Sequence, residues 1–180
     1  DLSYLKKETR ELVKALEGEA RKQKVAVEFF VGGSFAKGTL VKKDKYDIDV
    51  FVRFSWKYDE ISKLLENPLN KIAKSRKLKI EKIHGSRDYF RFDKNNLSFE
   101  VIPVLKIKKI NEAKNVTDLS YFHVNYVKKN LSKAMVREVL LAKRFCEAQG
   151  VYGAESYING FSGYGLECLI IYYKSFEKMV

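Results

Sequence analysis

The sequence is poor in cysteine and in long apolar runs, and each shortage excludes something. Its 180 residues include only two cysteines, Cys146 and Cys168, both within apolar helical patterns. We therefore expect buried free thiols in a reducing cytoplasm, not a disulfide framework or a cysteine metal site. No apolar run reaches membrane-spanning length, and the charged opening segment has no secretory signal, so we expect a cytoplasmic protein that does not engage a membrane.

Acidic residues are outnumbered by basic ones. The chain has 35 Lys and Arg against 23 Asp and Glu, which gives a formal net charge of +12. This excess favours a polyanion as partner, although lysines kept for solubility would give the same composition, and charge alone does not separate DNA from RNA. The hydrophobic content of 46% is that of an ordinary globular protein, and the length suits one domain or two small ones that share a core.

The first hundred residues alternate between helical and extended apolar patterns. Residues 1–22 repeat leucines at a period near 3.6, which predicts an amphipathic helix. Residues 57–77 are also helical in pattern, and Pro68 is expected to kink or break that helix. Strand patterns cover residues 25–31, 48–52, 78–83, 89–92 and 97–105. Because strands and helices alternate without a repeat, we expect a mixed sheet with helices on one face.

The pattern changes after a polar connector at residues 107–118. One helix is expected from Asp118 or Ser120 to about residue 130, and Ser132 is a suitable cap for the next, which ends at Gly150. A glycine-rich segment precedes a last apolar helix at residues 166–173. We therefore predict an α+β protein with two domains, a catalytic α/β domain at residues 1–108 and a helical domain at residues 109–180.

A small-residue turn and a pair of aspartates stand close together near the start of the predicted sheet. Gly32-Gly33-Ser34 follows the first strand, and a short helix or turn is expected at residues 35–41. Asp47 and Asp49 enter the second strand, where residues i and i+2 point to the same face. A divalent cation such as Mg²⁺ would offset their repulsion, and glycine backbone amides suit phosphates. Each feature alone is more often a plain turn or a solvated strand edge.

Glu100 is the candidate for a third carboxylate. It is the only acid in the apolar run 97–105, a strand that would neighbour the Asp47–Asp49 strand. Chemistry that uses two metal ions needs an acid of this kind beside the aspartate pair. Taken by itself, a lone glutamate in a strand is more often an edge residue that faces water.

The order of these features resembles the nucleotidyltransferase superfamily of DNA polymerase beta. More narrowly, Gly32-Gly33-Ser34, Asp47-Ile48-Asp49 and Glu100-Val101-Ile102-Pro103 resemble the catalytic domain of the archaeal, class I CCA-adding enzymes, which are tRNA nucleotidyltransferases. Motifs of the second half follow the same family in order and approximate spacing, and the resemblance covers nearly the whole chain. These later motifs are Phe122 to Val127, Leu141 to Cys146, Gly150 to Glu155 and Gly160 to Tyr164.

The resemblance implies a role for each of nine residues. Gly32, Gly33 and Ser34 would hold the nucleotide triphosphate. Asp47, Asp49 and Glu100 would be catalytic and would ligate two Mg²⁺ ions, with Glu100 on the ion that activates the attacking RNA hydroxyl. His123, Lys143 and Tyr152 match positions that contact the nucleotide in the family. Taken one at a time, each of these three residues also has an ordinary structural explanation. His123 could be a core or surface histidine with its hydrogen bonds satisfied, Lys143 a solvated helix residue, and Tyr152 part of the core packing.

The resemblance also implies a reaction, the addition of CMP and AMP from CTP and ATP to a tRNA 3′ end. The chain departs from the family in several ways, one of them Arg87-Asp88-Tyr89 before the third-acid strand, where the family often has a His-Pro-Tyr-like segment. The family usually has Glu then Asp in the metal pair and Asp as the third acid, whereas here the acids are Asp47, Asp49 and Glu100. The chain also ends where the family continues into domains that grip the tRNA. We therefore expect a fragment, a reduced enzyme, or one half of a split enzyme whose second polypeptide supplies those domains.

Two other functions stay open on the sequence alone. The same chemistry could serve a different acceptor, such as a small molecule or a protein side chain. Alternatively, the chain could be a non-catalytic RNA-binding partner subunit that keeps the fold, as its positive charge and its unusual Glu100 would allow.

Overall fold

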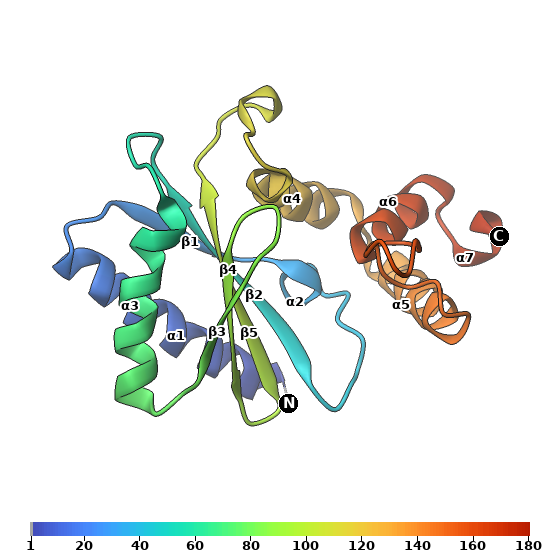
Figure 1. The fold of residues 1–180 in the computed structure, drawn as a ribbon. Coiled ribbons are helices and arrows are strands. Elements are labelled where there is room, and N and C mark those ends of the chain that lie inside the picture. Colours follow the sequence, from blue (N-terminus) through green and yellow to red (C-terminus); the bar gives the residue numbers. More distant parts are fainter. Residues whose placement is uncertain (1) are drawn as a thin grey trace. The chain divides into compact units, whose positions relative to one another are not determined.

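The computed structural model describes residues 2–180, which form two compact units (Figure 1). The first, here called the sheet unit, contains the chain up to Gly32 and then Asp44–Ser120. The second, the helical unit, contains Gly33–Lys43 and Tyr121–Val180. The polar connector that motivated a boundary at residue 108 lies inside the sheet unit. Because compactness alone does not define a domain, the domains 1–108 and 109–180 stay a prediction.

The sheet unit is built on five strands in the order β1-β2-β5-β4-β3. Only the central pair, β2 and β5, is parallel, and the other neighbours are antiparallel. The elements are α1 (Leu2–Lys22), β1 (Val27–Val31), β2 (Tyr46–Phe54), α3 (Ile61–Arg76), β3 (Ile80–Ile83), β4 (Tyr89–Lys94), β5 (Leu97–Leu105) and two short 3₁₀ turns, η1 (Ile110–Glu112) and η2 (Val116–Leu119). The predicted mixed sheet is confirmed.

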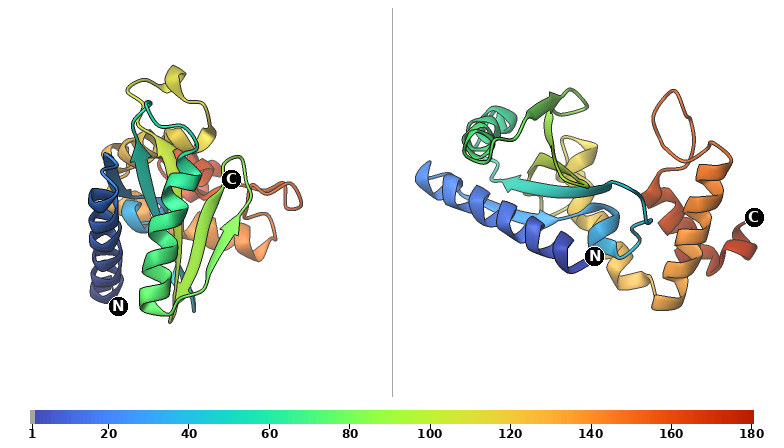
Figure 2. Two further views of the ribbon diagram at one scale, coloured as in Figure 1. Left: turned by 60° about the vertical axis from the view of Figure 1, so that its left-hand side comes forward. Right: turned by 90° about the horizontal axis from the view of Figure 1, so that it is seen from below.

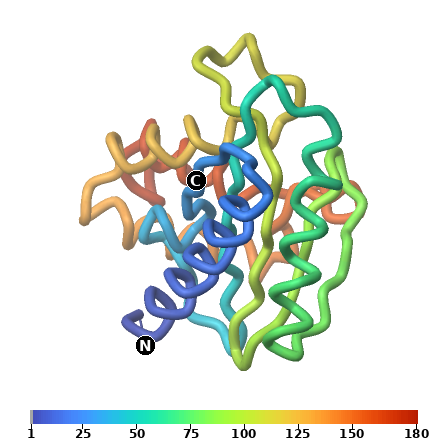
Figure 3. Tube along the Cα trace, turned by 90° about the vertical axis from the view of Figure 1, so that its left-hand side faces the viewer, coloured from blue at the N-terminus to red at the C-terminus, as the bar shows by residue number. Residues whose placement is uncertain are grey.

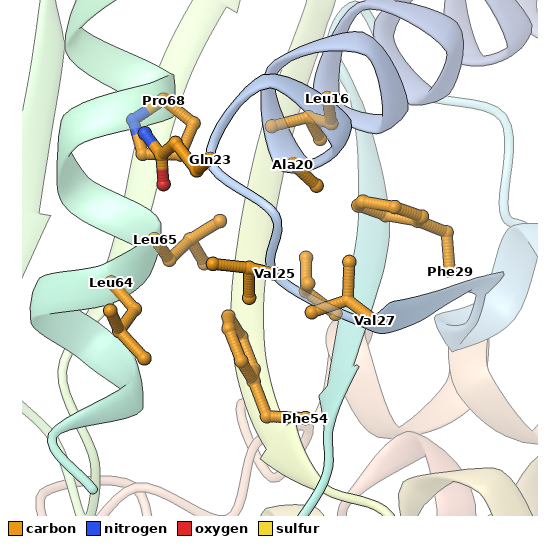
Figure 4. A pocket seen from close by; sticks show the side chains of 11 residues that line it. Leu16, Ala20, Gln23, Val25, Val27, Phe29, Phe54, Leu64, Leu65 and Pro68 are labelled. Carbon is orange, nitrogen blue, oxygen red and sulfur yellow. The ribbon is translucent and has the colours of Figure 1, made fainter. Parts of the chain in front are cut away.

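Helices α1 and α3 lie side by side against one face of this sheet (Figures 2 and 3). Alternation along β2 explains why: Ile48, Val50 and Val52 are buried on that face, while Asp47 and Asp49 point the other way. Figure 4 shows apolar side chains of α1, α3 and the first two strands turned toward a common hollow, among them Leu16, Leu65 and Phe54. The sheet thus has a packed apolar face and a second face free to carry polar groups.

The break predicted at Pro68 is wrong, while the kink given as its alternative stays a prediction. Helix α3 continues through this residue, although its ring removes one backbone donor. Pro68 is buried with Leu65, Leu69 and Ile72, so the apolar side of the helix has the same packing before and after it. Burial of that whole side offsets the loss of one hydrogen bond.

The connector is fixed to the sheet unit through Asp118. Its carboxylate accepts a hydrogen bond from the backbone N–H of Leu105 at 2.8 Å and forms an ion pair with Arg87 at 2.5 Å. The side chain of Asp118 is completely buried, and its second oxygen also accepts from the backbone of Asn115 at 3.0 Å. The polar composition of residues 107–118 therefore reflects a bound segment with its own capping contacts.

The helical unit contains one short helix from the first half of the chain and four from the second. They are α2 (Gly33–Lys37), α4 (Ser120–Asn130), α5 (Lys133–Ala148), α6 (Gly163–Tyr173) and α7 (Phe176–Met179). Ser132 caps α5 by accepting from Met135 N–H, as predicted. Helix α6 begins earlier than expected, because the Ser162 side chain caps it by accepting from Gly165 N–H. The core of the helical unit is formed mainly by apolar residues of α5 and α6, including Val139, Ala142, Leu166 and Ile170.

Two further expectations concern the residues that the structure describes. Both cysteines are free thiols; Cys146 is buried as predicted, whereas Cys168 is only half-buried. Within residues 2–180, none of the helices combines the length and the apolar character needed to cross a membrane.

Candidate active site

The strand register brings the three predicted acids to one face of the sheet. Asp47 and Asp49 are two residues apart on β2, and Asp49 is the direct partner of Glu100 on the parallel strand β5. Ser98 stands opposite Asp47 in the same register. Asp47 is exposed, whereas Asp49 and Glu100 are half-buried. This face is the one that α1 and α3 leave uncovered, so the predicted placement of Glu100 beside the aspartate pair is confirmed.

An apolar cluster continues this face beyond the acids. Phe51, Ile102 and Val104 form its buried part, with Phe30 and Tyr89 packed against them. The rings of Phe30 and Phe51 stack with centroids 4.7 Å apart. The cluster gives the acid face an apolar neighbour, and a less polar surrounding strengthens electrostatic interactions.

Gly32 directly follows β1 and lies next to the acids, and its lack of a side chain is required. Its backbone N–H donates to the carbonyl of Asp49 at 2.8 Å. A Cβ at this position would lie 2.2 Å from a ring carbon of Phe51, well inside contact distance. In the sheet unit, therefore, Gly32 allows the close approach of backbone and ring; this packing role is separate from the predicted phosphate role, which stays a prediction.

The structure adds Arg91, which sequence reasoning missed. Arg91 on β4 is the register partner of Glu100, and its Nε and Nη2 donate to Glu100 Oε1 at 3.0 and 2.5 Å. The Glu100 carboxylate raises the pKa of the Arg91 guanidinium further. Tyr89, two residues before Arg91, has a phenol pKa raised by burial and then by the charge of Glu100. The signal that could have found Arg91 is its place in the strand pattern 89–92, which alternation puts on the same face.

The donor set suits Mg²⁺ in its chemistry, because carboxylate oxygens are the ligands that this cation takes. The side chains as they stand do not form a complete site: among residues 2–180, no group of three His, Cys, Asp or Glu side chains converges as metal ligands. The ion pair with Arg91 accounts for part of this, since it holds the Glu100 carboxylate toward β4. The backbone thus places three acids together, while one of them is engaged by an arginine.

The other predicted site residues belong to the helical unit. Gly33 has a left-handed φ of 59° and begins the short helix α2, and the carbonyl of Ser34 accepts from Thr39 N–H at 3.0 Å. The segment that follows α2 is bound to α5, because Arg144 donates to the carbonyl of Lys42 at 2.5 Å. This segment is therefore held to the helix that carries Lys143.

Lys143 lies at the centre of a buried polar network. Its ammonium donates to Glu167 Oε1 at 3.2 Å, and to the Thr39 carbonyl and hydroxyl at 3.0 and 3.1 Å. Glu167 also accepts from the Thr39 hydroxyl and from Lys37, both at 2.5 Å. Burial lowers the pKa of the Lys143 ammonium, while the Glu167 charge opposes that shift. Two lysines share one carboxylate, so the network carries a surplus positive charge.

His123 and Tyr152 lie at the edges of this network. The His123 ring stacks on Tyr164, with centroids 4.0 Å apart, and Lys37 sits 5.7 Å from the centroid of the same tyrosine. Burial, and then the charge of Lys37, lowers the pKa of His123. Lys43 lies 5.8 Å from the centroid of Tyr152.

The residues predicted to contact the nucleotide also lie close to one another. A Cβ built on Gly163 would lie 2.9 Å from the Tyr152 hydroxyl and 3.6 Å from the Lys143 ammonium. Lys143 and Tyr152 therefore converge on the start of α6, and His123 joins them through Tyr164. Sequence reasoning missed Lys37, Thr39 and Glu167, although Glu167 is an isolated acid in an apolar helical run, which is a readable signal.

Two protein families match parts of the chain. The one described as a nucleotidyltransferase domain covers residues 9–144, and the one described as the second domain of tRNA nucleotidyltransferase covers residues 137–180. The chain is 43% identical over 155 residues to a CCA-adding enzyme of Nanoarchaeum equitans, which is 85% of this chain and 38% of that protein. It is 38% identical over 157 residues to the CCA-adding enzyme of Saccharolobus solfataricus, covering 86% of this chain and 37% of that protein.

Solved structures show the same fold at low sequence identity. A cytoplasmic RNA terminal U-transferase aligns with a TM-score of 0.64 and 16% identity over 93% of this chain and 45% of its own. A chain of the GLD-2/RNP-8 complex aligns with a TM-score of 0.69 and 13% identity over 96% of this chain and 50% of its own. The chain spans less than two fifths of the length of the curated relatives it matches. With its polymerase-beta-type α+β fold, it belongs to the nucleotidyltransferase-domain family and is a homologue of the archaeal CCA-adding enzymes.

Proposed function

We propose that this chain carries the nucleotidyl-transfer step of CCA addition in the cytoplasm. It would transfer CMP or AMP from CTP or ATP to the 3′ hydroxyl of a tRNA and release pyrophosphate. The observation that supports this most is the register of Asp49 with Glu100 beside Asp47, on the open face of the sheet in a chain of this family. The likeness to proteins named CCA-adding enzymes makes a tRNA the favoured acceptor.

In this proposal the sheet unit supplies the metal ligands. Asp47 and Asp49 would hold the cation that accompanies the triphosphate, and Glu100 would complete a second Mg²⁺ site. Bound Mg²⁺ supplies Lewis-acid activation of the attacking hydroxyl and charge stabilisation at the reacting phosphate. The protein's own part is to fix these carboxylates on adjacent strands, so that little side-chain reorganisation is needed at Asp47 and Asp49.

The helical unit would supply nucleotide contacts. Lys37 and Lys143 share the single carboxylate of Glu167, and a surplus positive charge at a buried network favours an anionic ligand. Gly33 and Ser34 precede Lys37 on the same short segment, which fits a phosphate-binding role for this turn. His123 and Tyr152 would contact the ribose or base, where a neutral imidazole and a phenol can hydrogen-bond.

The acceptor experiment uses a tRNA that lacks its 3′ CCA, with Mg²⁺ and each nucleoside triphosphate supplied in turn. We expect extension from CTP and ATP, and no extension when the RNA carries a 3′-deoxy end. Extension from other triphosphates only, or of an unrelated acceptor only, would contradict CCA addition.

A second candidate function rests on the Arg91–Glu100 ion pair. An arginine on the third acid, with no three-ligand group among residues 2–180, is also what a binding subunit without catalysis would show. Calorimetry with Mg·ATP and with tRNA distinguishes the two. Binding of both without extension from any triphosphate would favour the binding subunit.

A further inference from the structure

Glu100 occupies a position between two competing neighbours. It lies on β5, with Asp49 as its partner on β2 and Arg91 as its partner on β4. Neighbouring strands are about 4.8 Å apart, so a side chain as long as glutamate can lean toward either one. In the structure it leans toward β4, where both hydrogen bonds from Arg91 converge on the single oxygen Oε1.

The Arg91–Glu100 pair differs from the structural ion pair between Arg87 and Asp118 in the same unit. The Asp118 side chain is completely buried and also accepts backbone N–H groups, so that pair is locked into the fold. By contrast, the Arg91 side chain is 39% exposed and that of Glu100 is 20% exposed. Water can solvate both partners when they separate, so this pair can be exchanged at small cost.

We propose that Arg91 is a positioning residue that competes with the divalent cation for Glu100. In the cation-free protein its guanidinium holds the carboxylate toward β4 and partly offsets the charge of the acid cluster. Because both hydrogen bonds hold Oε1, the carboxylate stays turned toward β4 while they last, and its movement toward a cation beside Asp49 competes with them. This inference rests on the proposed function, because it assumes that a cation binds at the acid face.

The test is Mn²⁺ binding, followed by electron paramagnetic resonance, in the parent protein, Arg91→Gln and Arg91→Lys. Removing the competitor should tighten Mn²⁺ binding by about threefold to tenfold in Arg91→Gln, as expected for an exposed ion pair. Arg91→Lys should fall between the parent and Arg91→Gln, because lysine keeps the charge but not the paired donors. Melting temperatures in EDTA confirm that each variant folds.

Two controls separate this competition from a general effect of charge. Lys45→Gln removes the same charge close to Asp47, but Lys45 pairs with Asp93 at 2.6 Å and not with Glu100. It should change Mn²⁺ affinity much less than Arg91→Gln does. In a Glu100→Gln background, Arg91→Gln should have no further effect, because the contested carboxylate is gone.

The possible outcomes are distinct. Weaker Mn²⁺ binding in Arg91→Gln would mean that Arg91 orients Glu100 for the cation, and the competition would be overturned. Tightening that persists unchanged in the Glu100→Gln background would overturn it as well, in favour of long-range charge. If Mn²⁺ binds neither the parent nor any variant, the proposed function fails and the inference fails with it; parental binding with no Arg91 effect rejects the inference alone.

Discussion

The Lys143 ammonium lies 3.2 Å from Glu167 Oε1, and the side chains are 1% and 0% exposed. Lys37 adds a second ammonium 2.5 Å from the other oxygen of the same carboxylate. A carboxylate in this position holds α2, α5 and α6 of the helical unit to one another through charge. Such a network is costly to break from one side, because the charges that remain stay buried.

Glu167→Gln should therefore destabilise the protein by roughly 3–5 kcal/mol, the range for an uncompensated buried charge. Urea unfolding followed by circular dichroism measures this. Glu177→Gln, at an exposed position of helix α7, is the matched control and should leave the unfolding free energy unchanged. Adding Lys143→Met to Glu167→Gln should recover part of the loss, and no recovery would argue that the cost has another origin.

His123 predicts a pH effect of definite sign. His123 has a pKa lowered by burial and by Lys37, so the unfolded chain takes up the proton more readily than the folded one. Unfolding free energy should then fall as pH drops below 6.5, until the folded-state pKa is reached. His123→Phe, which keeps a ring on Tyr164, should lose this slope. A parental slope in His123→Phe would contradict this assignment.

Gly32→Ala tests the close approach at the end of β1. Its new Cβ would collide with the Phe51 ring, so we expect a loss of about 1–3 kcal/mol, typical of overpacking. Gly18→Ala in α1 is the control, since nothing lies within 4 Å of its Cβ, and it should stabilise by about 0.5–1 kcal/mol. Phe51→Leu should partly relieve Gly32→Ala in a double-mutant cycle; strictly additive losses would mean that the collision is relieved elsewhere.

Glu100 should matter more for chemistry than for nucleotide binding. Glu100→Gln should bind Mg·ATP within a few-fold of the parent yet lose transfer by on the order of 100-fold or more, the pattern of an interaction realised in the transition state. Glu100→Asp should be tolerated better, because it keeps the charge and is the acid usual in the family. Single-turnover assays beside calorimetry give both quantities, and parental transfer by Glu100→Gln would leave Glu100 a plain strand residue.

Strand alternation made much of the acid face predictable. Asp47 and Asp49 had to share a face, and the single acid in the run 97–105 identified Glu100 before its partner strand was known. Arg91 could not be assigned to Glu100 in the same way, because the pairing depends on the register of the β4–β5 hairpin. That register is fixed by its tight turn, where Asn95 adopts a left-handed φ of 55°.

The buried network around Lys143 could not be predicted from the sequence, for a different reason. Thr39 and Glu167 are 128 residues apart, and no local pattern indicates that a threonine after the glycine turn meets an acid of the last long helix. Pro68 is the opposite case, because here a clear local signal gave the wrong prediction. Its local preference against helix is real, but tertiary burial of Leu65, Leu69 and Ile72 decides the outcome.

The central claim, that this chain transfers nucleotides through its aspartate pair, is tested most directly by one comparison. The parent and the double variant Asp47→Asn with Asp49→Asn are given Mg²⁺, labelled ATP and CTP, and a tRNA lacking its 3′ CCA, and label in the RNA is counted. The account predicts labelled RNA with the parent and a loss of nearly all label with the double variant, whose melting temperature in EDTA stays close to the parental one. Equal label in both reactions would contradict it.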